Sequence, residues 1–510
     1  MGFVLSFYHS RRRLVAWGIL LLILLSMLAL LYRSIQPFMP YISDDALISL
    51  RYSQRLLAGH GLTWNDGRPV EGYSNLLWVL AIAFLGWLGN DLINAARLLG
   101  YLGMGASIFA ILYAHFPDRP ARICGSLLGS AAFALAAPIA IWTIGGLEQP
   151  LLLALLAWAW VFTLQLMRST NRVVQRALPA GLMFGLACLT RPDTPLFVAA
   201  AAIALLLHGG FRRENLIKIA WLLVIPVAFY AGQILFRSVY YGELVPNTAL
   251  VKAAFSWKRM LEGWSYIRKG LMPLGLLSIS AILTLIIASF SHRNRPEIYL
   301  FSFSALAWSV YLILIGGDIF PGWRHITPLI LIFAFLLASG MEWLWDNLQQ
   351  RFPDRPILSN GLMVVISLLG LFYLFRFYYY DQRRDQVNLY AVQERWEWKG
   401  LPVGEMLKRG FEAEQPLLAV DAAGSLPYFS ELPILDMLGL NDYYLPRHPP
   451  KDFGQGAIGH ELGDGRYFLE RNPDMIVFCY PDGKIEPCFT GGKQMVADPT
   501  FAKRYSLSTF

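Results

Sequence analysis

Asp44 and Asp45 are the residues of this chain whose type and position best suit acid–base chemistry. They begin a polar stretch, residues 43–75, which directly follows the first long hydrophobic run. A carboxylate beside basic groups can take a proton from an incoming hydroxyl group and so act as a general base. The pair therefore marks this stretch as a candidate catalytic segment.

The same two aspartates are also well suited to begin a helix. Ser43 is a natural N-cap residue, and an acidic residue in the first turn stabilises a helix by about 0.3–1 kcal/mol. Residues 46–57 have a helical pattern. At about 100° per residue, Asp44 shares a side of that helix with Arg51, whereas Asp45 points elsewhere. Capping and catalysis both stay open for the pair.

The composition predicts a membrane protein with several spans. Hydrophobic residues make up 56% of the chain and charged residues 15%, whereas soluble domains are about half apolar and a quarter charged. Residues 14–32 and 326–345 are uncharged enough and long enough to cross a bilayer, with the only charges near their ends. Arg11, Arg12 and Arg13 precede the first run, which lacks a small-residue cleavage site, so we expect an uncleaved anchor.

Charge in the loops predicts how the chain crosses the membrane, because basic residues favour the cytoplasmic side. If the N-terminus is inside and segment 76–88 lies in the interface, five basic loops fall on the cytoplasmic side. This segment is short for a span, so we expect it to be an amphipathic interfacial helix. About eleven spans follow, with the C-terminus outside. The expected spans are residues 14–32, 92–115, 123–140, 147–167, 178–189, 196–207, 217–235, 271–290, 298–315, 326–345 and 362–377. The basic loops carry Arg119 and Arg122; Arg168, Arg172 and Arg176; Arg212, Arg213 and Lys218; Arg293 and Arg295; and Arg351 and Arg355.

The loops expected on the outer face have a different composition. Each contains an acidic residue, and together they carry Glu148, Arg191, Asp193, Asn247, Lys252, Asp318, Arg324 and His325. Polar groups gathered at one membrane face indicate a functional site. Lys252, Arg324 and His325 would suit the phosphate of a donor from the lipid phase, although a single cation at the interface more often contacts lipid headgroups.

The chain divides into a membrane domain, residues 1–380, and a C-terminal domain, residues 381–510, which lacks long apolar runs. The C-terminal part holds two strand-like segments followed by turns, "PLLAVDAAGSLPYFS" and "PDMIVFCYPDG", so we expect a small α/β domain on the outer face. Cys479 and Cys488 flank a turn there, and an oxidising compartment would favour a local hairpin disulfide. No P-loop, HExxH motif or zinc-type Cys/His spacing occurs.

Several phrases occur in order along nearly the whole chain. They are "DDALISLRYSQRLLAGHGLTWNDGRPVEGYSNLLW", "RPD" at 191–193, "YYGELVPNT" followed by Lys252, "GGDIFPGWRHITP", "DAAGSLPYFSELPILDMLGLND" and "GHE" at 459–461. In these phrases the chain resembles the polytopic glycosyltransferases of the C superfamily (GT-C), and in particular the bacterial cell-wall arabinofuranosyltransferase branch. The first phrase is highly specific, whereas "RPD" alone would be weak.

The resemblance implies a mainly α, polytopic transmembrane fold with interfacial helices in a first exoplasmic loop, residues 33–91, and a small exoplasmic α/β domain. It implies that Asp44 or Asp45 is the base of an inverting transfer, with Asp44 preferred. Lys252 and Arg324 would contact the donor phosphate. The substrate-binding candidates are Arg51, Trp64, Asn65, Glu71, Tyr73, Asn75, Glu148, Arg191, Asp193, Asn247, Lys252, Asp318, Arg324, His325, Asp421, His460 and Glu461.

The resemblance also implies a donor, which is a polyprenyl-phosphate sugar. A glycosyl phosphate already has a good leaving group, so one base and nearby cations suffice, whereas glycoside hydrolysis needs two carboxylates. The other expected partners are a glycan or glycolipid acceptor and membrane lipids, with no nucleic acid. The expected location is the bacterial inner (plasma) membrane, with the active site facing the periplasm or exterior. No metal ligands are assigned, and a divalent cation stays open because some relatives use one.

Two other classes of function compete with a transferase. A lipid or glycan transporter or flippase would commonly contain internal repeats and broken helices at mid-membrane, and neither is visible in the sequence. A non-catalytic glycan-binding membrane protein would share the outer domain but would not turn over a donor. The sugar is not readable from the sequence: arabinofuranose is what the resemblance suggests, and pocket specificity depends on side-chain geometry.

Overall fold

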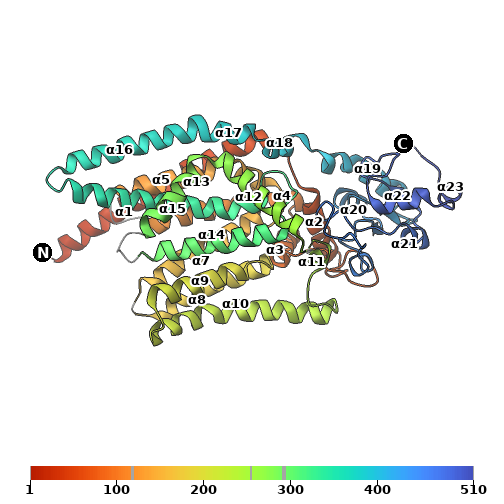
Figure 1. The fold of residues 1–510 in the computed structure, drawn as a ribbon, viewed down its shortest axis with the longest axis horizontal. Helices are drawn as coiled ribbons and strands as arrows, with labels where there is room; N and C mark the ends of the chain where they lie inside the picture. Colours follow the sequence, from red (N-terminus) through yellow and green to blue (C-terminus); the bar gives the residue numbers. More distant parts are fainter. Residues whose placement is uncertain (1, 116–119, 170, 253–254, 290–294, 509–510) are drawn as a thin grey trace.

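A computed structural model describes residues 2–115, 120–169, 171–252, 255–289 and 295–508. The expected loop residues Arg119 and Arg293 lie outside these ranges. The long helices run side by side along the longest axis of the molecule, and the C-terminal domain covers one end of this bundle (Figure 1). The N-terminus and the connection between α15 and α16 lie at the opposite end.

Within these described ranges, eight helices are long and apolar enough to cross a membrane, and each of two bent helix pairs would add one span. The eight are α1 (Gly2–Ile35), α4 (Leu92–His115), α7 (Gln149–Met167), α8 (Val173–Thr190), α10 (Arg213–Tyr240), α14 (Pro296–Ile315), α15 (Thr327–Arg351) and α16 (Pro356–Tyr373). The bent pairs are α5 (Pro120–Leu135) with α6 (Ala137–Ile144), and α12 (Trp257–Leu271) with α13 (Leu276–Ser289).

Each of the eleven expected spans coincides with one of these helices or with α9 (Pro195–Gly209), which has only 15 residues. Length and composition therefore support eight to ten spans. This number is below the expected eleven because α9 is short for a span and because the expected segment 271–290 belongs to a helix pair that bends by 104°. The direction in which the chain crosses stays a prediction.

Helix α3 (Leu76–Trp87) corresponds to the segment expected in the interface. The expectation that it is amphipathic is wrong, because its sequence, LLWVLAIAFLGW, has no charged residue on any side. Trp78, Val79 and Ile82 are buried, and α3 packs against α2 and α4. Its other side exposes Phe84 and Trp87.

Close helix packing builds the core of the membrane domain. Two glycines of α4 let it approach its neighbours, because a Cβ atom on Gly100 would lie 1.9 Å from the carbonyl oxygen of Thr143, and one on Gly103 would lie 2.5 Å from that of Pro150. Small residues at such contacts are typical of helix packing in membranes. Trp160, between α9, α14 and α15, completes an aromatic core with Phe197, Phe301 and Phe335.

The C-terminal domain is built on a parallel sheet of three short strands in the order β2-β1-β3, with β1 Leu418–Val420, β2 Ile434–Asp436 and β3 Met475–Val477. The helices around it are α19 (Trp396–Phe411), α20 (Ser425–Ser430), α21 (Gly465–Glu470), α22 (Thr490–Ala497) and α23 (Phe501–Arg504). Helices α17 (Tyr379–Arg384) and α18 (Gln386–Gln393) connect it to the membrane domain. The expected small α/β domain is therefore confirmed.

Short elements lie between the two domains. They are α2 (Asp44–Leu57), α11 (Asn247–Lys252), η1 (Gln36–Phe38) and η3 (Arg324–Ile326). Elsewhere, η2 (Met272–Leu274) joins α12 to α13, η4 (Leu374–Tyr378) is a π-helical segment between α16 and α17, and η5 (Leu445–Arg447) belongs to the C-terminal domain. Helix α2 packs against α3 on one side and against α20 and α19 of the C-terminal domain on the other. The residues that open the polar stretch are thereby held at the domain boundary.

Candidate active site

Two cavities of similar size, about 240 and 280 Å³, meet beside the start of α2. The interdomain cavity lies between the membrane domain and the C-terminal domain, and its ionisable lining residues are Tyr41, Asp44, Asp45, Lys252, Glu394, Asp421, Asp436 and His460. The arginine cavity is lined mainly by the membrane domain, together with Leu440 and Ile458 of the C-terminal domain, and its ionisable lining residues are Asp45, Tyr73, Glu148, Arg191, Asp193, Lys252, Tyr311, Asp318, Arg324 and His325. Asp45 and Lys252 line both.

Asp44 is tied to the C-terminal domain. Its carboxylate accepts hydrogen bonds from the backbone N–H groups of Gly424 (3.0 Å) and Ser425 (2.9 Å), where α20 begins. Burial raises the pKa of Asp44 to about 6, and these two bonds oppose the shift. The expected capping by Ser43 is wrong in one respect, since Ser43 occupies the N-cap position of α2 but its hydroxyl makes no capping bond.

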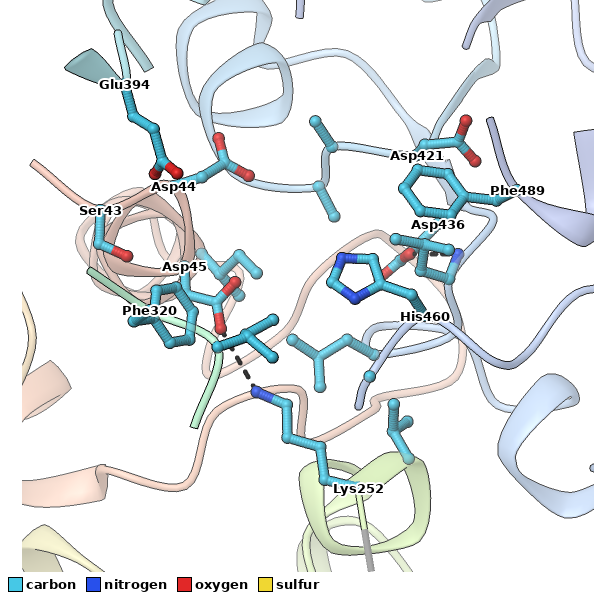
Figure 2. Close-up of a pocket in the computed structure, with 18 of the residues that line it drawn as sticks. Ser43, Asp44, Asp45, Lys252, Phe320, Glu394, Asp421, Asp436, His460 and Phe489 are labelled. Atoms are coloured by element: carbon cyan, nitrogen blue, oxygen red, sulfur yellow. Dashed lines mark hydrogen bonds and ion pairs between the residues drawn. The ribbon is translucent and has the colours of Figure 1, made fainter. Parts of the chain in front are cut away.

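Asp45 has a different environment from its neighbour. Its carboxylate lies 3.5 Å from the ammonium nitrogen of Lys252 in α11, with about a third of each side chain exposed to solvent (29% and 33%). Figure 2 shows this pair at the edge of the interdomain cavity. The sequence did not decide between the two aspartates and slightly favoured Asp44, whereas the structure leaves Asp45 the more open carboxylate.

The arginines of the arginine cavity are held by carboxylates. Arg191 donates from Nε and Nη2 to both oxygens of Asp193 and from Nη1 to Glu148 (2.7 Å). Asn75 donates to the other oxygen of Glu148 (2.9 Å). The "RPD" phrase, the first loop and the loop of Glu148 are therefore one buried network.

Arg324 is held in the same way. It donates from Nε (2.8 Å) and Nη2 (3.0 Å) to the two oxygens of Asp318, and its guanidinium lies 4.3 Å from the ring centre of Phe320. His325 lies beside it, with Nε2 3.8 Å from Asp318. Each arginine therefore has a fixed orientation before any ligand binds.

Several candidates from the first loop lie away from both cavities and connect the domains instead. Arg51 donates to the backbone carbonyl groups of Pro427 and Leu432, and its guanidinium lies over the ring of Trp64. Asn65 both donates to and accepts from the backbone of Ile434 in β2. These side chains hold the first loop against the C-terminal domain.

The other candidates outside the cavities are also structural. Glu71 forms an ion pair with Arg237 (2.6 Å), and burial still raises the pKa of Glu71 to about 7. Asn247 donates its side-chain amide to backbone carbonyls of Gly439, Leu440 and Asp442. Glu461 forms a buried ion pair with Arg259. These side chains therefore bind other parts of the protein and do not line either cavity.

The structure adds residues that the sequence did not single out. Glu394 follows α18 and lines the interdomain cavity, as do Asp436 and the aromatic rings of Phe320 and Phe489. Asp421 and Asp436 stand at the carboxyl ends of β1 and β2, and Cys479 follows β3, so this edge of the parallel sheet forms one wall of the cavity. The order of the strands in the sheet brings these residues to one edge. Strands of three residues are too short for the sequence to show which of them pair, so this edge could not be predicted.

Cys479 and Cys488 form a disulfide with Cα atoms 5.4 Å apart. It closes a loop and not the expected hairpin, because no strand follows β3 among the residues described up to 508. Over the residues that the structure describes, no group of three or more His, Cys, Asp or Glu side chains could hold a metal ion. Use of a divalent cation stays an untested prediction.

Comparisons with known proteins agree with the sequence motifs. The chain is 30% identical over 343 residues to the terminal β-(1→2)-arabinofuranosyltransferase of Mycobacterium tuberculosis, which covers 59% of this chain and 54% of that protein. It is 29% identical over 349 residues to the protein of the same name from Corynebacterium glutamicum, covering 59% and 48%. The chain thus spans about half the length of these curated relatives. A family described as a domain of unknown function (DUF8728) matches residues 386–509.

Solved structures share the fold. ArnT from Cupriavidus metallidurans bound to undecaprenyl phosphate matches with a TM-score of 0.54 and 15% identity, over 82% of this chain and 86% of that one. The oligosaccharyltransferase of Archaeoglobus fulgidus, tethered to an acceptor peptide, matches with a TM-score of 0.54 and 10% identity, over 82% and 64%. The chain is therefore an integral membrane protein with the expected GT-C fold, and the resemblance to arabinofuranosyltransferases is confirmed.

Proposed function

We propose that this GT-C protein is an inverting glycosyltransferase, which moves a sugar from a polyprenyl-phosphate donor to a hydroxyl group of a cell-envelope glycan. The names of the curated relatives favour arabinofuranose as the sugar. The observation that carries the proposal is the position of Asp45, an accessible carboxylate that borders both cavities. One cavity can then hold the donor and the other the acceptor, with a base between them.

The reaction needs one proton transfer and one substitution. Asp45 takes the proton of the acceptor hydroxyl, whose oxygen forms a bond to the anomeric carbon of the donor sugar. The bond between that carbon and the phosphate oxygen breaks, and the lipid phosphate leaves with the electron pair. Attack from the face opposite the phosphate inverts the anomeric centre.

The arginine cavity suits the donor phosphate. Arg191 and Arg324 are oriented there by carboxylates, and Lys252 reaches the same space from α11. Fixed cations near the leaving oxygen stabilise the charge that develops on it, and they need no reorganisation during the reaction. A structural neighbour was solved with undecaprenyl phosphate and another with a dolichol-phosphate, which supports a lipid-phosphate donor for this fold.

We further propose that both cavities face the periplasm or exterior of a bacterial inner membrane. The Cys479–Cys488 disulfide of the C-terminal domain supports this side, since disulfides persist in oxidising compartments. The α15–α16 connection, which carries Arg351 and Arg355, lies at the opposite end of the bundle, as expected for a cytoplasmic loop. A reporter fused after residue 508 should be active only outside the cytoplasm, and cytoplasmic activity would contradict the assignment.

The test of the activity uses the full chain in lipid nanodiscs with radiolabelled polyprenyl-phosphoryl arabinofuranose and octyl arabinofuranosides as acceptors. Labelled glycoside should form with the wild type and be absent with Asp45→Asn. Mass spectrometry of surface glycans, with and without the gene, would name the sugar and its linkage. Movement of the donor across a liposome membrane without any glycosidic product would support a flippase instead.

A further inference from the structure

Three polar groups around the interdomain cavity have hydrogen-bonding capacity that the protein does not use. The hydroxyl of Ser43 and one carboxylate oxygen of Asp421, Oδ1, are buried and have no hydrogen-bond partner among the residues that the structure describes. Within the described residues, the Glu394 carboxylate has no hydrogen bond or ion pair, although it is partly buried. Buried polar groups are normally paired, and an unpaired one is costly. The Ser43 and Asp421 atoms have almost no accessible surface, so the Glu394 carboxylate is the unpaired acceptor of the three that a ligand in this cavity can reach.

The position of the cavity also suits a ligand. Its wall on one side is the carboxyl edge of the parallel sheet, where Asp421 and Asp436 end their strands. Open α/β sheets commonly bind ligands outside the carboxyl ends of their strands. In Figure 2, Asp44, Asp45 and Glu394 occupy one side of the cavity and Asp421 and His460 the other, with Lys252 below.

The charges around this cavity are strongly unequal. Five carboxylates line it, those of Asp44, Asp45, Glu394, Asp421 and Asp436, against the single ammonium group of Lys252. Burial lowers the pKa of His460, which favours the neutral form of its ring. Such a cavity repels an anionic ligand and offers acceptors to hydroxyl groups.

The carboxylates differ in what they can offer. Asp436 accepts from the backbone N–H groups of Leu438, Gly439 and Asn441, and Asp44 accepts from two others, so both serve the framework. Glu394 makes no such bond to any residue that the structure describes. The rings of Phe320 and Phe489 add apolar surface on the same cavity, which suits the C–H face of a sugar ring.

We propose that the interdomain cavity is the acceptor subsite, that it selects an uncharged, hydroxyl-rich glycan end, and that Glu394 determines this specificity by accepting a hydrogen bond from an acceptor hydroxyl group. The inference rests on the proposed transferase function for the identity of the ligand as an acceptor. It assigns acceptor choice to the C-terminal domain, which contributes Glu394, Asp421, His460 and Phe489 to the cavity lining, and donor binding mainly to the membrane domain.

The test compares two probes that differ in one charge. They are an octyl arabinofuranosyl trisaccharide and the same compound with its terminal primary alcohol oxidised to a carboxylate. Binding is measured by saturation-transfer NMR and transfer by labelled product, with the full chain in nanodiscs. The wild type should prefer the neutral probe at least about tenfold. Glu394→Gln should raise the acceptor KM about tenfold and leave the donor KM unchanged, because the variant loses a charged acceptor of a hydrogen bond.

Two further variants separate specificity from folding. Glu405→Gln removes a charge from an exposed ion pair with Arg409 in the same domain, and it should behave as the wild type. Glu394→Lys should reverse the preference and favour the anionic probe, a gain that a misfolded protein cannot produce.

Each outcome decides one of the two proposals. Transfer with an unchanged acceptor KM and preference in both Glu394 variants would overturn the subsite and leave the transferase standing. Binding of the neutral probe that depends on Glu394, without transfer by the wild type, would keep the subsite and overturn the transferase. If neither probe bound the wild type, the acceptor subsite would be wrong.

Discussion

The two cavities that meet at Asp45 differ in how their charges are paired. In the arginine cavity, Arg191 and Arg324 are each bound to carboxylates by bidentate hydrogen bonds. In the interdomain cavity, five carboxylates face one lysine, and the Glu394 carboxylate has no partner within the described residues. The arginine cavity is thus organised before a ligand arrives, whereas the interdomain cavity has unused acceptors.

This difference indicates what each cavity can bind. Paired arginines still have N–H groups in fixed directions, which suits a phosphate that must be held in one geometry. Free carboxylates suit hydroxyl groups, whose arrangement differs from one glycan to another. Asp45 belongs to both cavities and joins the two halves of the reaction.

The largest expected effect separates Asp45 from Asp44. Asp45→Asn should lower kcat about 10²–10⁴-fold, since the amide cannot take the proton of the acceptor. Asp44→Asn should lower it less than about tenfold, because Asp44 acts through the backbone of Gly424 and Ser425. Single-turnover transfer assays check both. Equal losses in the two variants would mean that the base is not Asp45 alone.

The next prediction concerns pairing in the arginine cavity. Arg191→Met should destabilise the protein by about 3–5 kcal/mol, because it leaves Glu148 and Asp193 buried without their partner. Lys252→Met should destabilise the protein by less than about 1 kcal/mol, because the ion pair of Lys252 with Asp45 is partly solvated. The same variant should raise the donor KM. Thermal unfolding in nanodiscs measures stability. A similar loss in both variants would contradict the difference in pairing.

A third prediction tests how the C-terminal domain is attached over Asp44. A Cβ atom on Gly424 would lie 2.1 Å from the backbone oxygen of Asp44, so Gly424→Ala must push α20 away from α2. We expect faster amide hydrogen exchange in α20 and a higher acceptor KM, with the donor KM unchanged. Gly410→Ala, where a Cβ atom meets nothing within 4 Å, is the matched control. Unchanged exchange in α20 would show that this contact does not attach the domain.

The smallest expected effect is on pH dependence. Burial raises the pKa values of Asp44, Asp421 and Asp436 to about 6, and it also raises the pKa of Glu394. The other charged or titratable groups that face the cavity are Tyr41, Asp45, Lys252 and His460. The carboxylates of Asp44, Asp421 and Asp436 are therefore charged above pH 6 and become neutral as the pH falls through this value. The preference for a neutral over an anionic acceptor should weaken a few-fold between pH 7.5 and pH 5.5.

The ratio of the two transfer rates measures this preference, because both reactions depend equally on the base. A preference that is constant over this pH range, or that grows as the pH falls, would mean that these carboxylates do not select the acceptor.

Much of the architecture could be predicted because it depends on local patterns. Long apolar runs predicted the membrane helices, and the change of composition near residue 380 predicted a separate α/β domain. The polar loops that carry Glu148, Arg191 and Asp318 were expected at one face, and they do line one cavity. The predicted roles of single residues within a motif were less reliable. Arg51 and Asn65 were expected to bind substrate, but they hold the first loop against the C-terminal domain.

Residue types and their order along the chain therefore determined which elements form and which polar segments gather at one end of the bundle. Only the tertiary structure decided the roles of individual side chains. Asp44 and Asp45 are adjacent and chemically identical, but consecutive residues of a helix point about 100° apart. One carboxylate consequently meets backbone N–H groups of a domain some 380 residues later in the chain, and the other faces the space between two cavities.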